Sequence, residues 1–113
     1  MLYNNKEGEY MNKINERIME IKKELQELGD LRPGSISMQY AKPKEKKGAF
    51  FQISYTHKMK SKSDYVKKDY VKEMKKQLKE YKKFKSLVEE WVDLGIKKSK
   101  LMMKTNLREL GKK

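Results

Sequence analysis

The sequence predicts an α+β fold in which two long helices form a coiled-coil-like hairpin, with a small three-stranded antiparallel β-meander inserted between them. Three observations support this prediction: a helical hydrophobic stripe before residue 30, alternating polar and apolar residues over 35–66, and a longer helical stripe after residue 67. The 113 residues are enough for one domain with a modest core. We therefore expect a single domain over 1–113.

A first helix is predicted over residues 9–29. Its apolar residues recur at intervals of four and three, which is the narrow stripe of a coiled-coil helix. They are Ile14, Ile18, Ile21, Leu25 and Leu28. Gly29 follows the stripe, where helices often end on a left-handed residue, and Arg32-Pro33-Gly34 then turns the chain. We expect the helix to end near Leu28.

Three antiparallel strands are predicted within residues 35–66. Polar and apolar side chains alternate there in three runs, at 35–40, 49–57 and 61–66. In the middle run the alternation directs Phe51 and Ile53 to a core and Gln52 and Ser54 to the opposite face. The sheet should therefore have one apolar face and one polar face.

A second helix is predicted over 68–104, where proline is absent and apolar residues fall at helical spacing. A glycine inside a helix costs about 1 kcal/mol relative to alanine. The pattern therefore allows one long helix, or two helices with a bend at Gly95. The tail at 105–113 is expected to fray.

This second helix is predicted to be much longer than the first, at about 57 Å against about 30 Å. Its apolar residues exceed what the shorter helix can bury, so a second copy of the chain is the simplest cover. We predict a homodimer through this stripe, with a role in the chain's own core as the alternative. The stripe consists of Phe84, Leu87, Trp91, Leu94 and Leu101.

The net charge of +13 points to a polyanionic partner such as nucleic acid. The competing explanation is a lysine-rich codon bias, since 26 of the 29 basic residues are lysine. The charge is uneven, however: it is −1 over 9–29, +5 over 30–66 and +7 over 67–104. A uniform lysine excess does not predict this asymmetry.

Several classes of function and location are disfavoured. There is no cysteine, and His57 is the only histidine, so we expect no metal site, no cofactor and no catalytic activity. No apolar run approaches the roughly 20 residues needed to span a bilayer, and the first ten residues lack a signal-peptide pattern. We expect a cytoplasmic protein with no membrane partner.

The polar face of the predicted sheet is the first candidate for nucleic-acid binding. Short hydroxyls and amides can bond to base edges and phosphate oxygens, and a small sheet can enter the DNA major groove. An ordinary solvated face is the alternative, but carboxylates are absent from it until Asp64. The candidates are Ser35, Ser37, Gln39, Gln52, Ser54, Thr56 and Lys58, with Lys60 and Lys62.

Two further features complete the candidate interface. A lysine loop between the first two strands, with Arg32 nearby in sequence, can neutralise several phosphates; the alternative is a solubilising loop. Its lysines are Lys42, Lys44, Lys46 and Lys47. Phe50 breaks the alternation and should point outward, where it can stack on an unpaired base or be covered by protein.

Three segments carry a resemblance to a known family: RPGSIS at 32–37, GAFFQISYTHK at 48–58 and YKKFKSLVEEW at 81–91. Together they resemble an uncharacterised family of small bacterial and archaeal proteins, often found near mobile genetic elements, over roughly residues 10–104. The resemblance implies a helix, an RPGSL-type turn, a tyrosine-rich hairpin and a long helix. Family members look as if they carry a cysteine cluster between the first two strands, and this chain has the lysine loop instead.

These observations predict a small, basic, non-enzymatic nucleic-acid-binding protein, associated with a mobile element, that grips DNA through the β-meander and its lysine loop. A structured RNA is the alternative nucleic acid. A protein-binding adaptor or inhibitor that docks through its helical stripe is the alternative class.

Overall fold

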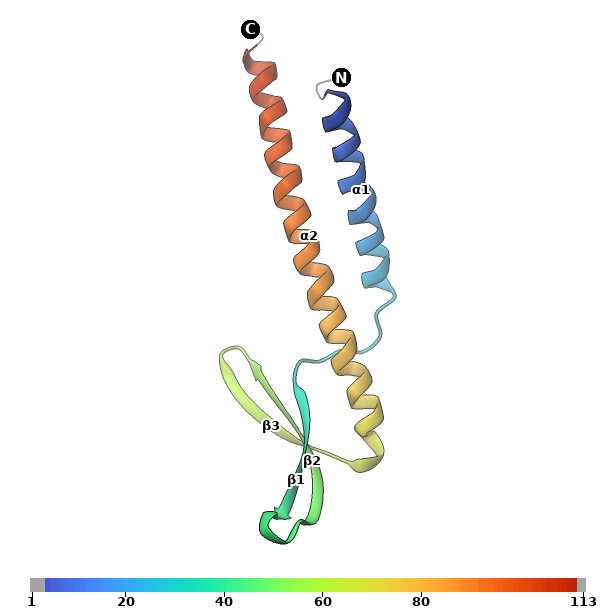
Figure 1. Ribbon diagram of the computed structural model, residues 1–113, viewed down its shortest axis with the longest axis vertical. Helices are drawn as coiled ribbons and strands as arrows, with labels where there is room; N and C mark the ends of the chain where they lie inside the picture. The colour runs from blue at the N-terminus through green and yellow to red at the C-terminus, as the bar shows by residue number, and fades with distance from the viewer. Residues whose placement is uncertain (1–3, 112–113) are drawn as a thin grey trace. The chain divides into compact units, whose positions relative to one another are not determined.

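The computed structural model describes residues 4–111, and the side chains of residues 4–106 (Figure 1). Within that range the chain forms two α-helices and a three-stranded antiparallel sheet that lies between them in sequence, so the predicted α+β class is confirmed. The elements are α1 (Asn5–Gln26), β1 (Ser35–Lys42), β2 (Lys47–His57), β3 (Lys60–Val66) and α2 (Val71–Gly111), with short 3₁₀ turns at Pro43–Glu45 and Lys68–Tyr70.

Two compact units make up the chain. Unit 1 contains the described residues of 1–27 and 85–113, and unit 2 contains residues 28–84. Helix α2 contributes its first part to unit 2 and the remainder to unit 1. Each unit is described separately below.

Helix α1 begins and ends earlier than predicted. A capping box sets its start, because the Asn4 side chain accepts a hydrogen bond from the Glu7 backbone N–H at 2.8 Å while Glu7 bonds back to the Asn4 backbone. At the other end the Glu27 N–H donates to the carbonyls of Lys23 and Glu24. These bonds satisfy terminal carbonyls. The left-handed cap predicted at Gly29 is therefore wrong, since Gly29 is not among the residues with positive φ.

In unit 1, α1 packs against the C-terminal part of α2. The α1 stripe is buried at Met11, Ile14, Ile18 and Ile21, and α2 buries Leu87, Leu101 and Thr105. Ion pairs join Arg17 to Glu90 and Glu7 to Lys104, so the two helices run antiparallel. The Lys22 ammonium lies 5.3 Å from the Trp91 ring centre.

Helix α2 is continuous through Gly95, which selects one long helix over two. The tail predicted to fray from 105 is helical up to Gly111, and residues 112–113 lie outside the described range. No side chain or neighbouring backbone would meet a Cβ at Gly95 within 4 Å. The glycine therefore neither ends the helix nor marks a close contact with another element.

In unit 2 the first part of α2 covers one face of the sheet, whose strand order is β1-β2-β3. Ile53 on the central strand is 0 % exposed and forms a core with Val66, Met74 and Leu78. Ile36, Phe51 and Val71 pack at the margin of this core. The predicted apolar face of the sheet is thus the face that α2 covers.

The turn before β1 is held to the sheet by close contacts. Gly34 has φ +132°, and a Cβ there would lie 2.9 Å from both Ile53 Cγ1 and the Ser54 carbonyl oxygen. The Arg32 guanidinium lies 4.8 Å from the Tyr55 ring centre and 3.4 Å from Asp64. The Arg-Pro-Gly motif therefore docks the start of β1 against β2 and β3.

Candidate nucleic-acid interface

The face of the sheet turned away from α2 is built from rows of side chains that face each other across the strands. The register pairs Ser54 with Ser35 and Ser63, and Gln52 with Ser37 and Tyr65. Paired residues on antiparallel strands point to the same face, so the rows can be assigned directly. From the β2–β3 turn to the lysine loop, the rows are Thr56–Ser61, Ser35–Ser54–Ser63, Ser37–Gln52–Tyr65 and Gln39–Phe50.

These rows contain no carboxylate: in the described strands Asp64 pairs with Ile53 and so belongs to the α2 side. Six of the predicted face residues lie together as expected. They are Ser35, Ser37, Gln39, Gln52, Ser54 and Thr56. Hereafter this surface, with Phe50, Ser61, Ser63 and Tyr65, is called the polar face.

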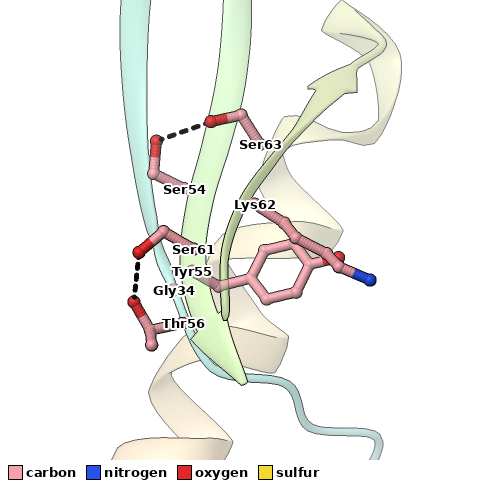
Figure 2. Close-up of a pocket in the computed structure, with 7 residues that line it drawn as sticks. All are labelled: Gly34, Ser54, Tyr55, Thr56, Ser61, Lys62 and Ser63. Carbon is pink, nitrogen blue, oxygen red and sulfur yellow. Dashed lines mark hydrogen bonds between the residues drawn. The ribbon is translucent and has the colours of Figure 1, made fainter. Parts of the chain in front are cut away.

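Hydroxyl groups dominate one half of the polar face. Ser54 and Ser63 share a hydrogen bond of 3.4 Å, and Thr56 and Ser61 share one of 3.2 Å (Figure 2). These four residues, together with Gly34, Tyr55 and Lys62, line an open depression of about 490 Å³. Each hydroxyl keeps acceptor capacity and can reorient its proton, so this half can bond to phosphate or base oxygens and nitrogens.

Aromatic and amide groups dominate the other half. Phe50 lies on the polar face as predicted and is half-buried beside Gln39. Tyr65 is 68 % exposed and lies across from Gln52. Sequence reasoning missed Tyr65, although the signal was present: a third strand that buries Val66 must turn Tyr65 outward.

The predicted lysine loop borders this aromatic half. Lys42 and Lys47 are paired directly across β1 and β2, and within residues 4–106 neither forms an ion pair. Like charges in directly opposite positions destabilise a sheet. Lys44 and Lys46 are exposed on the connecting turn, where Lys46 adopts a left-handed φ of 51°. The alternation puts the Lys42–Lys47 pair on the α2 side of the sheet, so the loop borders the end of the polar face through Lys44 and Lys46.

The remaining predicted lysines lie in the β2–β3 turn and on β3, but not on the polar face. Lys58 lies in the turn with φ 52°. Lys60 and Lys62 pair with His57 and Tyr55, which puts both lysines on the opposite face. The prediction that they lie on the outer face is wrong. The turn between β2 and β3 has two residues, so the even-numbered residues that face outward on β2 are followed by odd-numbered residues that face outward on β3.

Arg32 is also engaged elsewhere. Its guanidinium packs on Tyr55 and pairs with Asp64, and its backbone N–H donates to the Gln77 carbonyl at 3.4 Å. Both side-chain partners lie on the α2 side of the sheet. We therefore assign Arg32 to the structure of unit 2 instead of to the polar face.

Positive charge is concentrated in unit 2. Residues 28–84 contain sixteen basic and six acidic residues, a net charge of +10 out of +13. Besides the lysine loop, α2 has a row of exposed lysines that the candidate residues did not include. They are Lys72, Lys75, Lys76, Lys79, Lys82 and Lys83. Lys75, Lys79 and Lys82 line a hollow with Leu78 and Ile36, so part of this row borders the sheet. Their spacing of three and four residues is the helical signal that identifies the row.

Most of the apolar stripe predicted to form a dimer is covered within the chain itself. Leu87 and Leu101 are buried within the chain, whereas Phe84 is 37 % exposed. Trp91 and Leu94 are partly buried. The predicted excess length of α2 is covered by the sheet through Met74 and Leu78, so a second copy is not needed for that purpose. The homodimer itself stays a prediction.

Residues 4–106 include no group of three or more His, Asp or Glu side chains positioned to hold a metal ion. Among the described helices none is long and apolar enough to cross a membrane.

Comparison with known families places the polar face in a recognised domain. A family model described as a domain of unknown function (DUF6788) matches residues 11–76. The chain belongs to this family. The match agrees with the predicted resemblance to an uncharacterised family, and the mobile-element neighbourhood stays a prediction. No curated protein and no solved structure matches the chain.

The DUF6788 match contains all three strands, and therefore the whole polar face and the lysine loop. It also contains the Arg-Pro-Gly turn and the first residues of α2, ending at Lys76. Both features of the candidate interface thus lie within the family domain.

Proposed function

We propose that this protein binds nucleic acid through unit 2, with bases over the polar face and phosphates on the neighbouring lysines. The observation that carries the proposal is the net charge of +10 over residues 28–84, around a polar face with no carboxylate among its described residues. Basic side chains supply most of the affinity for nucleic acid, while side chains at base edges supply selectivity.

The unrelieved pairing of Lys42 and Lys47 supports a polyanionic ligand in particular. In the free protein these ammonium groups repel each other across two strands. A phosphate placed between them would replace repulsion by attraction for both. The amides of Gln39 and Gln52 lie in the half of the polar face nearest this charge, and the hydroxyl rows lie at its other end, which suits a ligand that combines phosphates with bases.

Binding is tested by fluorescence anisotropy with labelled duplex DNA, single-stranded DNA and structured RNA, each at two salt concentrations. We expect affinity that weakens as salt rises, with a slope of log K against log salt of roughly −0.7 to −0.9 for each phosphate neutralised. If affinity for all three remains no tighter than millimolar at low salt, or does not depend on salt, nucleic-acid binding is excluded as the function.

A charge-reversed variant locates the interface. Replacing Lys44, Lys46 and Lys47 by glutamate should remove about three phosphate contacts, and so reduce the magnitude of the salt slope by about 2 to 3. The matched control makes the same charge change in unit 1, with glutamate at three exposed lysines. These are Lys13, Lys97 and Lys100. Equal losses in both variants would show that only total charge matters.

A second candidate, the protein-binding adaptor, is favoured by an exposed apolar row on α2 within unit 1. Val92 is 55 % exposed, Ile96 50 % and Met103 58 %, at spacings that bring them to one side of the helix. We propose that this row, on a coiled-coil-like pairing of α1 and α2, is the surface for a partner helix or a second copy. Under this function the loop variant keeps its activity, and Ile96→Asp loses it.

A further inference from the structure

We propose that the polar face takes unpaired bases of a single-stranded nucleic acid, which stack on the rings of Phe50 and Tyr65. This inference rests on the proposed function and names the class of ligand for that same site. It differs from the prediction made from the sequence, which favoured duplex DNA over single strands.

The first reason is the position of the two rings. Phe50 is on β2 and Tyr65 is on β3, and the register makes them diagonal neighbours on one face, because Tyr65 pairs with Gln52. Such diagonal neighbours are roughly 7–8 Å apart. Tyr65 is 68 % exposed, and Phe50 is half-buried but lies outside the core cluster. Two aromatic residues therefore occupy diagonal positions on the face of the sheet turned away from α2.

The second reason is what an aromatic ring can recognise. A duplex presents base edges in its grooves and hides the flat faces of the bases in the stack. Successive bases in that stack are about 3.4 Å apart along each strand. Diagonal positions on paired strands are spaced at about twice that rise, so two rings that start from them suit bases that have been separated from their neighbours. Stacking on aromatic side chains is how proteins bind such bases.

The third reason is the set of polar groups beside each ring. Gln52 lies across from Tyr65, and Gln39 lies across from Phe50. The Gln39 amide donates to the Ser37 hydroxyl at 3.1 Å, which orients its carbonyl oxygen as a free acceptor. An amide next to a stacked base can bond to its Watson–Crick edge, which is exposed only in an unpaired base.

The lysine loop completes the site. It follows the Gln39–Phe50 row along β1 and β2, so a strand that stacks on Phe50 can continue to this end of the sheet. There its phosphates would meet the exposed Lys44 and Lys46 of the turn, while the Lys42–Lys47 pair faces the α2 side of the sheet. The hydroxyl rows at the other end of the polar face can receive the next sugar or phosphate.

The experiment compares three variants for binding to a single-stranded oligonucleotide and to the duplex of the same sequence. Tyr65→Ala should weaken single-strand binding about 5- to 100-fold and duplex binding by less than about 3-fold, because only the single strand stacks. Tyr65→Phe keeps the ring and should bind like the parent chain. Tyr10→Ala is the control, since Tyr10 is a 46 % exposed tyrosine in unit 1. Circular dichroism melting checks that every variant is folded.

DNA and RNA single strands are measured in parallel. If either binds more tightly than the duplex and loses affinity in Tyr65→Ala but not in Tyr65→Phe, the inference is supported. If the duplex binds at least as tightly as both single strands, or if Tyr65→Ala binds them unchanged, the inference is overturned while nucleic-acid binding stands. If no nucleic acid binds, the proposed function fails together with it.

Discussion

Gly34→Ala should destabilise unit 2 severely, for two separate reasons. The residue has φ +132°, and a side chain held in such a conformation costs about 1–3 kcal/mol. The new Cβ would also lie 2.9 Å from Ile53 Cγ1 and 2.9 Å from the Ser54 carbonyl oxygen. Ile53 is 0 % exposed and cannot move into solvent, so overpacking adds about 1–3 kcal/mol.

The combined loss of about 2–6 kcal/mol is a large fraction of the 5–15 kcal/mol by which small proteins are stable. The assay is urea unfolding followed by circular dichroism, which gives the free energy of unfolding. The matched control is Gly95→Ala, a glycine inside α2 with no side chain or neighbouring backbone within 4 Å of its Cβ position. That variant should gain about 0.5–1 kcal/mol from helix propensity.

The two glycines thus have opposite expected signs. A loss of less than about 1 kcal/mol in Gly34→Ala would refute the argument that the turn before β1 depends on the contact with Ile53. A loss in Gly95→Ala would show that this part of α2 has packing constraints beyond its own helix.

Three further predictions concern charge and packing. Lys47→Glu should raise the melting temperature of the free protein slightly, because attraction to Lys42 replaces repulsion, while nucleic-acid affinity falls; a stability loss measured by thermal melting would contradict this. The Arg17 guanidinium lowers the pKa of Glu90 in the folded protein. As pH falls, the Glu90 carboxylate is therefore protonated in the unfolded chain before it is protonated in the folded one. The stability that this pair contributes is therefore fully present above the ordinary glutamate pKa of about 4.3 and is lost as pH falls through the lower pKa of the folded state. The melting temperature of Glu90→Gln, measured against pH, should lack this acid-dependent loss. Leu87→Ala should lower the free energy of unfolding by about 2–5 kcal/mol at every protein concentration, since the chain itself buries Leu87; a concentration-dependent loss would favour a dimer seam.

Local patterns in the sequence predicted the elements and the middle of the sheet. The alternation around Ile53 identified the core side, and it placed Gln52 and Ser54 correctly on the polar face. The period of two is a property of the strand itself, so no tertiary information was needed. The alternation within β3 also assigns Tyr65 to the polar face once Val66 is known to be buried, but that burial depends on the pairing register, which the β2–β3 turn sets.

Features that depend on tertiary packing were not predictable from these patterns. A hydrophobic stripe on α2 shows that something covers it, but not that the sheet covers Met74 and Leu78. An arginine near a lysine loop in sequence was expected to join it, whereas Arg32 found Tyr55 and Asp64 across the sheet. In both cases the partner comes from a distant part of the chain.

The position of Trp91 has a practical consequence for studying this protein. It is the only tryptophan and lies in unit 1, whereas the polar face lies in unit 2 and has tyrosine and phenylalanine as its aromatic residues. Tryptophan emission therefore reports on unit 1, while the polar face itself offers only tyrosine and phenylalanine rings. A shift in tryptophan emission on titration would show that binding affects the surroundings of Trp91, and an unchanged spectrum would show that it does not.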